Sequence, residues 1–462
     1  MLKSGRVIDP LSGIDGLSDL IVINGKIDAC EPTGTLTPPE GAWVLDCGGM
    51  WVVPGLIDPH AHLRDPGFAE KETIVSGLRA AAAGGFTAVA AMANTSPVND
   101  SPETTYYMLE RARQAQGARL VPVSAVTEGL RGRELVDFGA MVQAGVRLFS
   151  DDGIPIDDQA LLARAFDEAA RAGFAISLHE EDRALTNNGA MNAGAASKHL
   201  GVAGIPAAAE SLRVRRDLAL AIGSEAPAHI AHVSTAEGVE LIRAAKKRGA
   251  NVTCEVTPHH FTLDDSAVLE WGPNARMAPP LRSWGDVEVL LDAMADGTID
   301  MIATDHAPHD PASKCMNQLG HLFGPGRPVP RLSADQAETF AHAANGVVGL
   351  ETALGLALSL VHRGIINAAR MVEMMAVNPA RLLRLSENGS LAAGSPADIT
   401  IIDPNCEWTV KPNMFRSISR NTPFAGMRLK GLATTTIVGG EVIFARRHPH
   451  PTLSRKGAGE GH

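Results

Sequence analysis

The chain reads Gly55-Leu-Ile-Asp-Pro-His60-Ala-His62-Leu-Arg64-Asp-Pro-Gly67 at the end of an apolar run that begins at Trp51. Side chains alternate between the two faces of a β-strand, so His60 and His62 project from the same face. Two imidazoles held side by side supply half of a site for a transition metal. The glycines and prolines on both sides mark where the strand begins and ends. The segment therefore predicts a strand that delivers two metal ligands.

From this strand to about residue 385, apolar segments alternate with helical segments rich in Ala, Leu, Glu and Arg. Such alternation is typical of a parallel sheet, and eight strand units indicate a closed α/β barrel of the (β/α)8 TIM type. An open, doubly wound sheet is the alternative that the pattern leaves open. The predicted strands are 51–57, 86–92, 120–126, 146–149, 174–178, 228–231, 251–256 and 299–303.

The two ends of the chain have the composition of β structure. Short β-rich pieces occur in residues 1–50 and again in residues 390–445. Neither segment is long enough for a core of its own, so we expect the two to pair into a small β-sandwich domain. The barrel then occupies residues 51–389. Residues 446–462, rich in Arg, His, Pro and Gly, are predicted to be disordered.

Bulk composition is that of an ordinary globular protein. The 462 residues are 45% hydrophobic, and 41 basic against 52 acidic residues give a net charge of −11. Because no Lys/Arg cluster stands out and no apolar run reaches about 18 residues, we expect neither nucleic acid nor a membrane as a partner. The five cysteines form no Cys-x-x-Cys pair, and the N-terminus lacks the apolar core of a signal peptide. Both features predict a cytoplasmic protein with reduced thiols.

Polar side chains that can bind metal follow several of the predicted strands. Active sites of barrels lie at the carboxyl ends of the strands, so side chains in these positions converge. Taken singly, each has an ordinary explanation, such as a histidine satisfied at a strand end, an Asp-Asp-Gly turn or a helix cap. Their joint occurrence predicts one site. In chain order the candidates are His60, His62, Asn94, Asp151, Asp152, His179, His232 and Asp305.

Imidazole and carboxylate ligands suit Zn²⁺, with Mn²⁺, Fe²⁺ and Co²⁺ as alternatives. An open catalytic zinc site uses three protein ligands, and this set is larger. The set therefore favours two ions that share a bridging carboxylate over a single ion. A metal pair activates water and polarises a carbonyl, and a carboxylate beside it can carry a proton to a leaving nitrogen. The predicted reaction is hydrolysis of an amide-like bond.

Nearly the whole chain resembles the amidohydrolase superfamily, and within it the long bacterial type of dihydroorotase. This resemblance implies a zinc-dependent cyclic amidohydrolase that interconverts L-dihydroorotate and N-carbamoyl-L-aspartate in pyrimidine biosynthesis. The motifs that carry it are 55–67, Glu72-Thr73, Phe149-Ser-Asp-Asp-Gly153, His232-Val-Ser-Thr235, Val256-Thr-Pro-His-His260, Thr304-Asp-His-Ala-Pro-His309, Val348-Gly-Leu-Glu-Thr352 and Asn421-Thr-Pro-Phe424.

The resemblance also implies which residues hold the two metal ions. His60, His62 and Asp305 would hold one ion, and His179 and His232 would hold the other. Asp305 would in addition be the catalytic residue that moves a proton to the departing ring nitrogen.

The two ions would be bridged by a side chain that follows the fourth strand. Many relatives have a carboxylated lysine there, and this branch has an aspartate. The chain offers only Asp151 and Asp152 at this point. The spacing to His179 favours Asp152, with Asp151 as the alternative.

Substrate contacts follow from the same resemblance. Arg64 and Asn94 would grip the carboxylate of the substrate, a role that the guanidinium fork suits. His309 would make a further contact with the substrate. Asn345 and Gly346 belong to the segment whose backbone would meet the pyrimidine ring.

Two departures from the family pattern leave questions open. Ala278 stands where most relatives have an asparagine that contacts the substrate, so an allantoinase-like or hydantoinase-like activity is one alternative. The segment 310–344 is long and rich in Pro and Gly, and could be a lid, an oligomer contact or a surface insertion. A second alternative is a non-catalytic homologue that serves as a structural partner of aspartate transcarbamoylase. A homo-oligomer and a transcarbamoylase partner are both compatible with the resemblance.

Overall fold

The computed structural model of the chain describes residues 1–446 and 453–455, and two large β-sheets organise it. One sheet has eight strands in the order β15-β14-β13-β10-β9-β8-β7-β6, and the pairs along this order are parallel. In chain order its strands are β6 (Leu56–Ala61), β7 (Phe86–Ala91), β8 (Arg119–Ser124), β9 (Leu148–Ser150), β10 (Ala175–Leu178), β13 (Ala228–Ile230), β14 (Val252–Val256) and β15 (Met301–Ile302).

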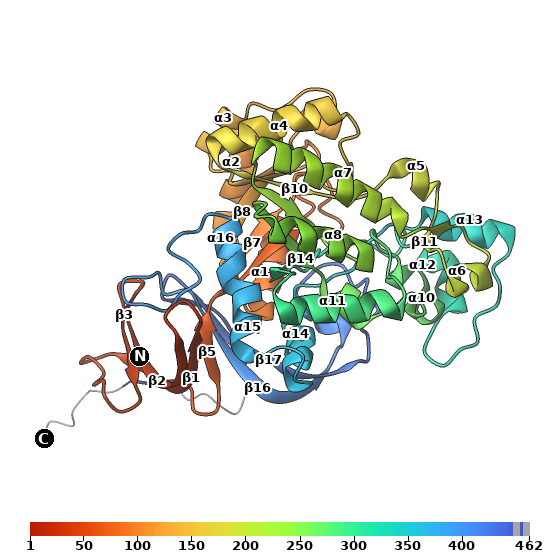
Figure 1. Cartoon of the computed structure of the whole chain (residues 1–462). Helices are drawn as coiled ribbons and strands as arrows, with labels where there is room; N and C mark the ends of the chain where they lie inside the picture. The colour runs from red at the N-terminus through yellow and green to blue at the C-terminus, as the bar shows by residue number, and fades with distance from the viewer. Residues whose placement is uncertain (447–452, 456–462) are drawn as a thin grey trace, which may run out of the picture.

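The first and last strands of this sheet meet at their carboxyl ends. Ala61 and His306 form a parallel bridge, and the backbone N–H of His62 donates to the carbonyl of His306 at 2.8 Å. The sheet is thereby nearly closed, and helices cover its outside (Figure 1). The predicted (β/α)8 barrel is confirmed, and the open, doubly wound sheet is excluded.

The prediction of one strand over 51–57 is wrong, because two strands in different sheets share this apolar run. β5 (Trp51–Pro54) pairs with β1 (Leu2–Asp9) and β16 (Ile399–Thr409) in the second sheet. The barrel strand β6 begins only after Gly55. A Cβ atom at Gly55 would collide with the side chain of Thr87 in β7. The chain passes so close to β7 between β5 and β6 that this position requires glycine.

The helices that surround the barrel have well-defined ends. In α1 (Ile74–Gly84) the Thr73 side chain accepts from the backbone N–H of Ser76, and Gly85 ends the helix in the left-handed region at φ 97°. The buried face of α1 is rich in alanine, which lets the helix pack closely on the barrel. The further helices around the barrel are α2 (Pro102–Arg113), α3 (Phe138–Ala144), α4 (Gln159–Ala172), α7 (Ala208–Ser224), α8 (Ala236–Lys247), α11 (Trp284–Asp296), α14 (Ala353–His362), α15 (Ala368–Val372), the π-helix η4 (Glu373–Val377) and α16 (Asn378–Leu382).

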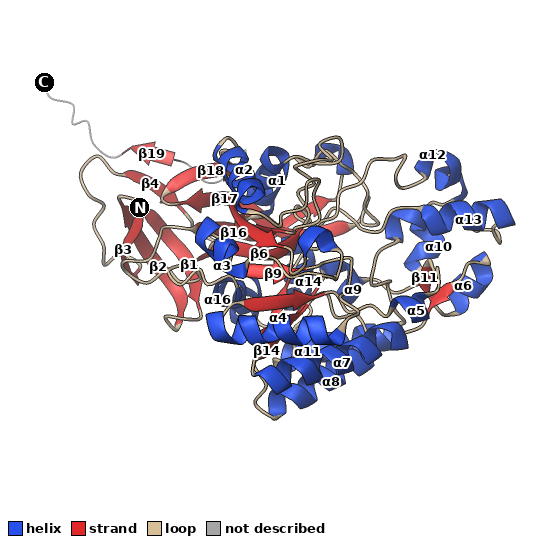
Figure 2. Cartoon of the chain, turned by 90° about the horizontal axis from the view of Figure 1, so that it is seen from above, coloured by secondary structure: helices blue, strands red, loops and turns tan. Residues whose placement is uncertain are grey.

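Short elements form a lateral layer at one end of the barrel (Figure 2). The segment 310–344 belongs to this layer, and its Leu319, Phe323 and Phe340 are buried in an apolar cluster with residues from elsewhere in the layer. The segment is therefore an integral part of the fold and not a loose surface insertion. The elements of the layer and the remaining short turns are η1 (Glu128–Leu130), α5 (Arg183–Thr186), β11 (Met191–Asn192), α6 (Ala195–Leu200), β12 (Gly204–Ile205), α9 (Pro258–Thr262), α10 (Ala267–Trp271), η2 (Gly272–Ala275), α12 (Met316–Leu319), η3 (Gly320–Leu322), α13 (Ala334–His342) and η5 (Pro412–Met414).

The second sheet combines strands from both ends of the chain, as predicted. Its main path is β18-β17-β16-β5-β1-β2-β3; off this path β4 pairs with β1, and β19 pairs with β4. Ile27 and Ile437, from strands near opposite ends of this path, lie in one apolar cluster, so the sheet curls over its own core. Its further strands are β2 (Ile14–Ile23), β3 (Lys26–Pro32), β4 (Trp43–Asp46), β17 (Arg428–Val438), β18 (Glu441–Ala445) and β19 (Leu453–Arg455).

The predicted disordered tail, 446–462, falls mostly outside the described residues. Within it the structure describes Arg446 and the strand β19, which pairs with β4 in antiparallel orientation.

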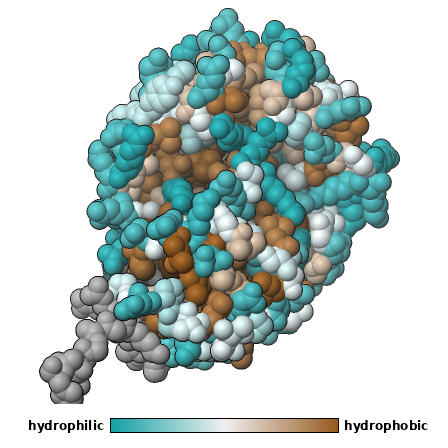
Figure 3. Space-filling model, turned by 90° about the vertical axis from the view of Figure 1, so that its left-hand side faces the viewer, coloured by the Kyte–Doolittle hydropathy of each residue, from teal (hydrophilic) through white to brown (hydrophobic). Residues whose placement is uncertain are grey.

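The surface on the side of the second sheet alternates between apolar and hydrophilic areas (Figure 3). Exposed large apolar side chains from this sheet include Leu17 at 64% and Trp43 at 55%. In the described part of the chain, no helix combines the length and the apolar character needed to span a bilayer.

Candidate metal centre and substrate cavity

The six predicted metal ligands lie together at the carboxyl ends of the barrel strands. Each lies in β6 or within three residues of the end of β6, β9, β10, β13 or β15. Each is buried, with at most 8% of its surface exposed. Side chains that are more than 240 residues apart in the sequence are thereby in contact. The six are His60, His62, Asp152, His179, His232 and Asp305.

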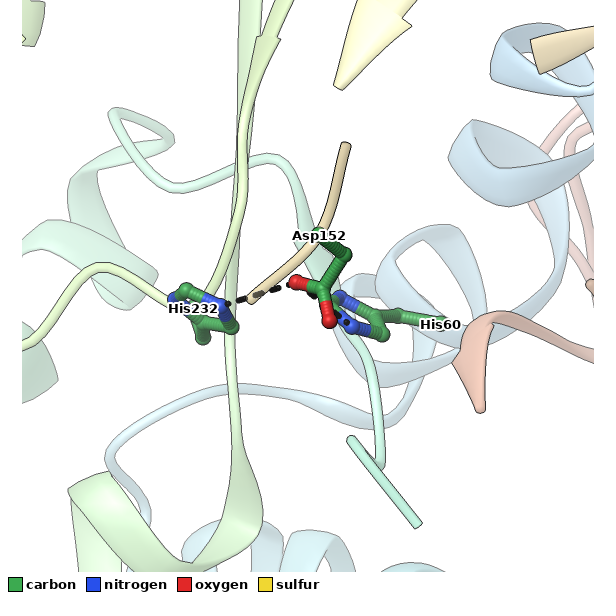
Figure 4. A group of neighbouring side chains, drawn as sticks. All are labelled: His60, Asp152 and His232. Atoms are coloured by element: carbon green, nitrogen blue, oxygen red, sulfur yellow. Dashed lines mark ion pairs between the residues drawn. The ribbon is translucent and has the colours of Figure 1, made fainter. Parts of the chain in front are cut away.

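The carboxylate of Asp152 is at the centre of the four histidines. Its Oδ1 lies 3.4 Å from His60 Nε2, 3.4 Å from His179 Nδ1 and 3.5 Å from His232 Nε2. Its Oδ2 lies 3.4 Å from His62 Nε2. Figure 4 shows the carboxylate between the His60 and His232 rings, and a ring nitrogen of each histidine is paired with Oδ1. The two oxygens of one carboxylate thus face different histidines.

These separations fit ligands of a shared metal ion. Tetrahedral zinc with bonds of about 2.0–2.2 Å places neighbouring ligand atoms about 3.4 Å apart, which matches the contacts of Asp152. His60 Nε2 and Asp152 Oδ1 are both buried and have no hydrogen-bond partner among the residues that the structure describes. Buried polar atoms normally have a partner, so this pair is explained well by a cation. The donor set therefore fits a bound metal.

Two overlapping groups of side chains meet the geometry of a metal site. His60, Asp152 and His232 form one, and His60, His62 and Asp305 form the other. In the second group, Asp305 Oδ1 lies 3.0 Å from His62 Nε2 and 3.7 Å from His60 Nε2. Two adjoining groups that share a ligand can hold two ions close together.

The electrostatics keep both aspartates ionised. Burial raises the pKa of the Asp152 carboxyl, but the charge of His60 and the contacts with His179 and His232 lower this pKa more, to well below its usual range. The same balance lowers the pKa of Asp305, where the contact with His62 is the largest opposing effect. Ionised carboxylates are the form that binds metal.

A cavity of about 260 Å³ adjoins these ligands. All five residues predicted to contact the substrate line this cavity, so the fold brings them together beside the metal ligands. Ala278 lines it as well, as do Gly153, Glu181 and Ala307, which the sequence did not single out. The five predicted contacts are Arg64, Asn94, His309, Asn345 and Gly346.

Arg64 offers a half-buried cation to this cavity. Its Nη2 donates to His309 Nε2 at 3.2 Å and its Nε donates to the carbonyl of Pro308 at 3.3 Å. Burial lowers the pKa of Arg64 to about 10, and burial together with Arg64 lowers the pKa of His309 to about 2. Among the described residues, no carboxylate forms an ion pair with this guanidinium. The arrangement suits a ligand that brings its own carboxylate.

Comparison with known proteins agrees with this geometry. Residues 49–238 match the family described as Dihydro-orotase-like. Over 445 residues the chain is 45% identical to a dihydroorotase of Syntrophus aciditrophicus (strain SB), with 96% of this chain and 99% of the relative covered. The chain belongs to the dihydroorotase family. It is therefore a hydrolase that acts on cyclic amides.

A second dihydroorotase and a solved structure of a hydantoinase are also similar to the chain. The chain is 44% identical to a dihydroorotase of Geobacter metallireducens over 446 residues, which cover 96% of this chain and 99% of the relative. Its structure superposes on an L-hydantoinase (dihydropyrimidinase) from Arthrobacter aurescens with a TM-score of 0.82 and 25% identity, covering 98% of this chain and 97% of the other. The fold and the cyclic-amide chemistry of the family agree with the barrel and its cavity.

Asp151 contacts a different part of the protein from its neighbour Asp152. Asp151 Oδ1 accepts from the backbone N–H groups of Val126 and Thr127 at 2.7 and 3.0 Å, and the Thr127 hydroxyl donates to Oδ2. Through these hydrogen bonds the carboxylate holds the loop after β8 in place. Of the two aspartates that the sequence left open, Asp152 is the one that faces the histidines.

The backbone is strained at three residues of the site. Arg64, His232 and Asp305 have φ angles of 60°, 33° and 43°, in the left-handed region that residues with a Cβ rarely adopt. Each such residue costs on the order of 1–3 kcal/mol and persists where the surroundings enforce it. Functional sites often contain residues in such conformations.

Glu255 contacts a proposed metal ligand, and the sequence interpretation missed it. It lies in β14, where its Oε1 is 2.6 Å from His60 Nδ1 and its Oε2 is 3.1 Å from His229 Nε2. Burial raises the pKa of Glu255, but the charge of His60 and the contact with His229 lower it to about 2. A carboxylate on the far nitrogen fixes the orientation and tautomer of a metal-binding histidine. The available signal was an acidic residue within the predicted buried strand 251–256.

Glu255→Gln is expected to lower metal affinity and kcat/KM by about 10–100-fold, because the amide orients His60 less firmly than the carboxylate does. Metal titration and steady-state kinetics measure both effects. Glu270→Gln, at an exposed position on α10, is the matched control and should leave both unchanged. Wild-type values for Glu255→Gln would show that the contact with His60 is not functional.

Proposed function

We propose that the protein is a zinc-dependent dihydroorotase that interconverts L-dihydroorotate and N-carbamoyl-L-aspartate in pyrimidine biosynthesis. One observation carries the proposal: the part-buried guanidinium of Arg64, without a carboxylate partner among the described residues, lies in the same cavity as the metal ligands. Both dihydroorotate and carbamoyl-aspartate carry a carboxylate beside the amide bond that reacts. The cavity therefore pairs an anchor for this carboxylate with a centre for amide hydrolysis.

The proposed cofactor is zinc, one or two ions, with two favoured by the overlapping ligand groups. When bound, zinc would supply an activated water and polarise the ring carbonyl. The contacts of both Asp152 oxygens with histidines support this residue as the bridge. The proposed ligands are His60, His62 and Asp305 for one ion, His179 and His232 for the other, and Asp152 for both.

The chain's own residues would then perform three tasks. Asp305, ionised and at the edge of the cavity, would accept a proton and deliver it to the departing ring nitrogen. Arg64 would bind the substrate carboxylate together with Asn94, and His309 would add a contact from beside Arg64. Asn94 Oδ1 also lies 2.9 Å from His62 Nδ1, so this side chain would orient a metal ligand as well.

Arg64→Met is expected to raise KM for L-dihydroorotate by about 100-fold, because the substrate carboxylate would lose its charged partner in a buried site. The effect on an uncharged ring such as hydantoin should be much smaller. Steady-state kinetics on both rings measure the difference. Arg133→Met, an exposed arginine outside the cavity, is the control. Equal losses on both rings would contradict a carboxylate-binding role.

The proposed activity is tested by assaying zinc-loaded protein on L-dihydroorotate, with allantoin and hydantoin in parallel. We expect dihydroorotate turnover with kcat/KM of about 10⁴ M⁻¹s⁻¹ or more. Hydantoinase-like activity is the second candidate, favoured by Ala278 in the cavity wall and by the hydantoinase superposition. Turnover of another ring alone would retain the metal chemistry and reject the proposed substrate.

The proposal extends to cellular context. We expect a cytoplasmic enzyme that forms a homo-oligomer or associates with aspartate transcarbamoylase, with neither nucleic acid nor a membrane as a partner. The alternative of a non-catalytic structural homologue is disfavoured by the complete set of buried ligand residues. Metal analysis of the purified protein separates the two, since a non-catalytic partner need not bind zinc.

A further inference from the structure

Lys314, in the segment 310–344, is completely buried at 0% exposure. Its Nζ donates to three backbone carbonyls, those of Arg276 at 3.1 Å, Ala344 at 2.7 Å and Gly346 at 3.0 Å. An ammonium group has three N–H donors and a neutral amine has two, so three acceptors match the charged form. One side chain thus ties together three points of the backbone.

Arg276 binds the same part of the chain from the other side. Its Nη2 donates to the carbonyl of Ala341 at 2.8 Å, and its Nη1 donates to Asn345 Oδ1 at 2.6 Å and to the carbonyl of Ala343. Its own carbonyl accepts from the N–H of Gly346 at 2.9 Å. The two cations together bind nearly every residue from 341 to 346.

Neither cation forms an ion pair with a carboxylate in the described part of the chain. Burying a charge is costly, and here only carbonyl and amide oxygens compensate for it. Burial, and then the charge of Arg276, lower the pKa of Lys314 well below its usual range, and the three carbonyl acceptors act against this loss of the charged form. Closing a loop with two buried cations costs more free energy than closing it with neutral groups. The reason for this arrangement is therefore to be found in the function of the loop.

The bound segment is a wall of the substrate cavity. Asn345 and Gly346 line the cavity, and Ala278, two residues after Arg276, lines it too. Gly346 has φ 117°, and a Cβ atom there would collide with Ala307. The segment therefore has little room to move.

We propose that Lys314 and Arg276 are positioning residues that fix the Asn345–Gly346 wall relative to Ala278 and so set how tightly the ring substrate binds. This inference rests on the proposed function for its kinetic part. It assigns the segment 310–344 a role in substrate binding through Lys314.

The test compares Lys314→Met with Lys198→Met, an exposed lysine of α6 in the same lateral layer. In Lys314→Met the hydrocarbon stem is kept and the three donors are lost. We expect KM for L-dihydroorotate to rise about tenfold or more, with kcat and zinc content within about twofold of wild type. Hydrogen exchange of the amides of 341–347, measured without substrate, should become at least about tenfold faster. Lys198→Met should change none of these values.

Hydrogen exchange separates failure of this inference from failure of the proposed function. If exchange accelerates in Lys314→Met but the wild-type protein turns over no dihydroorotate, the positioning role of Lys314 is supported and the substrate assignment is wrong. Unchanged exchange and unchanged KM in Lys314→Met would overturn the inference, and so would a loss confined to kcat. Should Lys314→Met not fold, Arg276→Met removes the donors to the carbonyls of Ala341 and Ala343 and to Asn345 Oδ1, and wild-type KM and exchange in that variant would overturn the inference equally.

Discussion

Asp305→Asn is expected to lower kcat by about a thousandfold or more while the protein keeps its metal. The amide oxygen of asparagine can still contact the site, but an amide cannot take up and release a proton as a carboxylate does. Removal of a general acid–base group costs about 10²–10⁴-fold in rate. In wild type the surrounding imidazoles outweigh burial and keep the pKa of Asp305 low, so the base form is present at neutral pH. Single-turnover kinetics and metal analysis of the same sample measure the two quantities.

Asp167→Asn, at an exposed position on α4, is the matched control and should retain wild-type kcat. The prediction requires that the loss in Asp305→Asn appear in kcat at full metal occupancy. A variant that turns over at near wild-type rate would reject Asp305 as the proton carrier. A variant that has lost its metal would show instead that Asp305 acts chiefly as a ligand.

The positions of the proposed metal ligands were predictable because each depends on a local pattern. A buried strand in a barrel ends at the face where active sites lie, so a histidine or aspartate after such a strand has a known location. His179 and His232 could be placed in this way without knowledge of their partners. Their convergence on Asp152 follows from closure of the barrel, which the alternation of strands and helices predicts.

Features that depend on distant packing were not predictable in the same way. The run 51–57 is apolar throughout, but the chain passes from one sheet to the other at Gly55, where the backbone lies close to Thr87. A lysine in a Pro/Gly-rich segment, such as Lys314, is expected at the surface. Its burial depends on carbonyls that lie 30 or more residues away in the sequence. Local periodicity contains no information on such contacts.

Asp152→Asn and Asp151→Asn are expected to fail in different ways, although the two residues are neighbours. Asp152→Asn replaces a carboxylate that contacts four histidines, so metal content should fall and kcat/KM should drop by more than about 100-fold. Asp151→Asn weakens buried hydrogen bonds to the loop after β8, so it should destabilise the fold by about 1–3 kcal/mol and leave metal binding intact. Metal stoichiometry and chemical denaturation of both variants measure the contrast.

The electrostatics of the two aspartates give the physical basis of this contrast. A carboxylate must be ionised to bind a metal, and histidines outweigh burial at Asp152 to hold its pKa well below the usual range. Burial instead raises the pKa of Asp151 to about 6, despite its hydrogen bonds with Thr127 and Val126. The hydrogen bonds from Val126 and Thr127 already occupy both oxygens of Asp151 and leave little capacity for an ion. Metal loss in Asp151→Asn with retention in Asp152→Asn would reverse the assignment of the bridge.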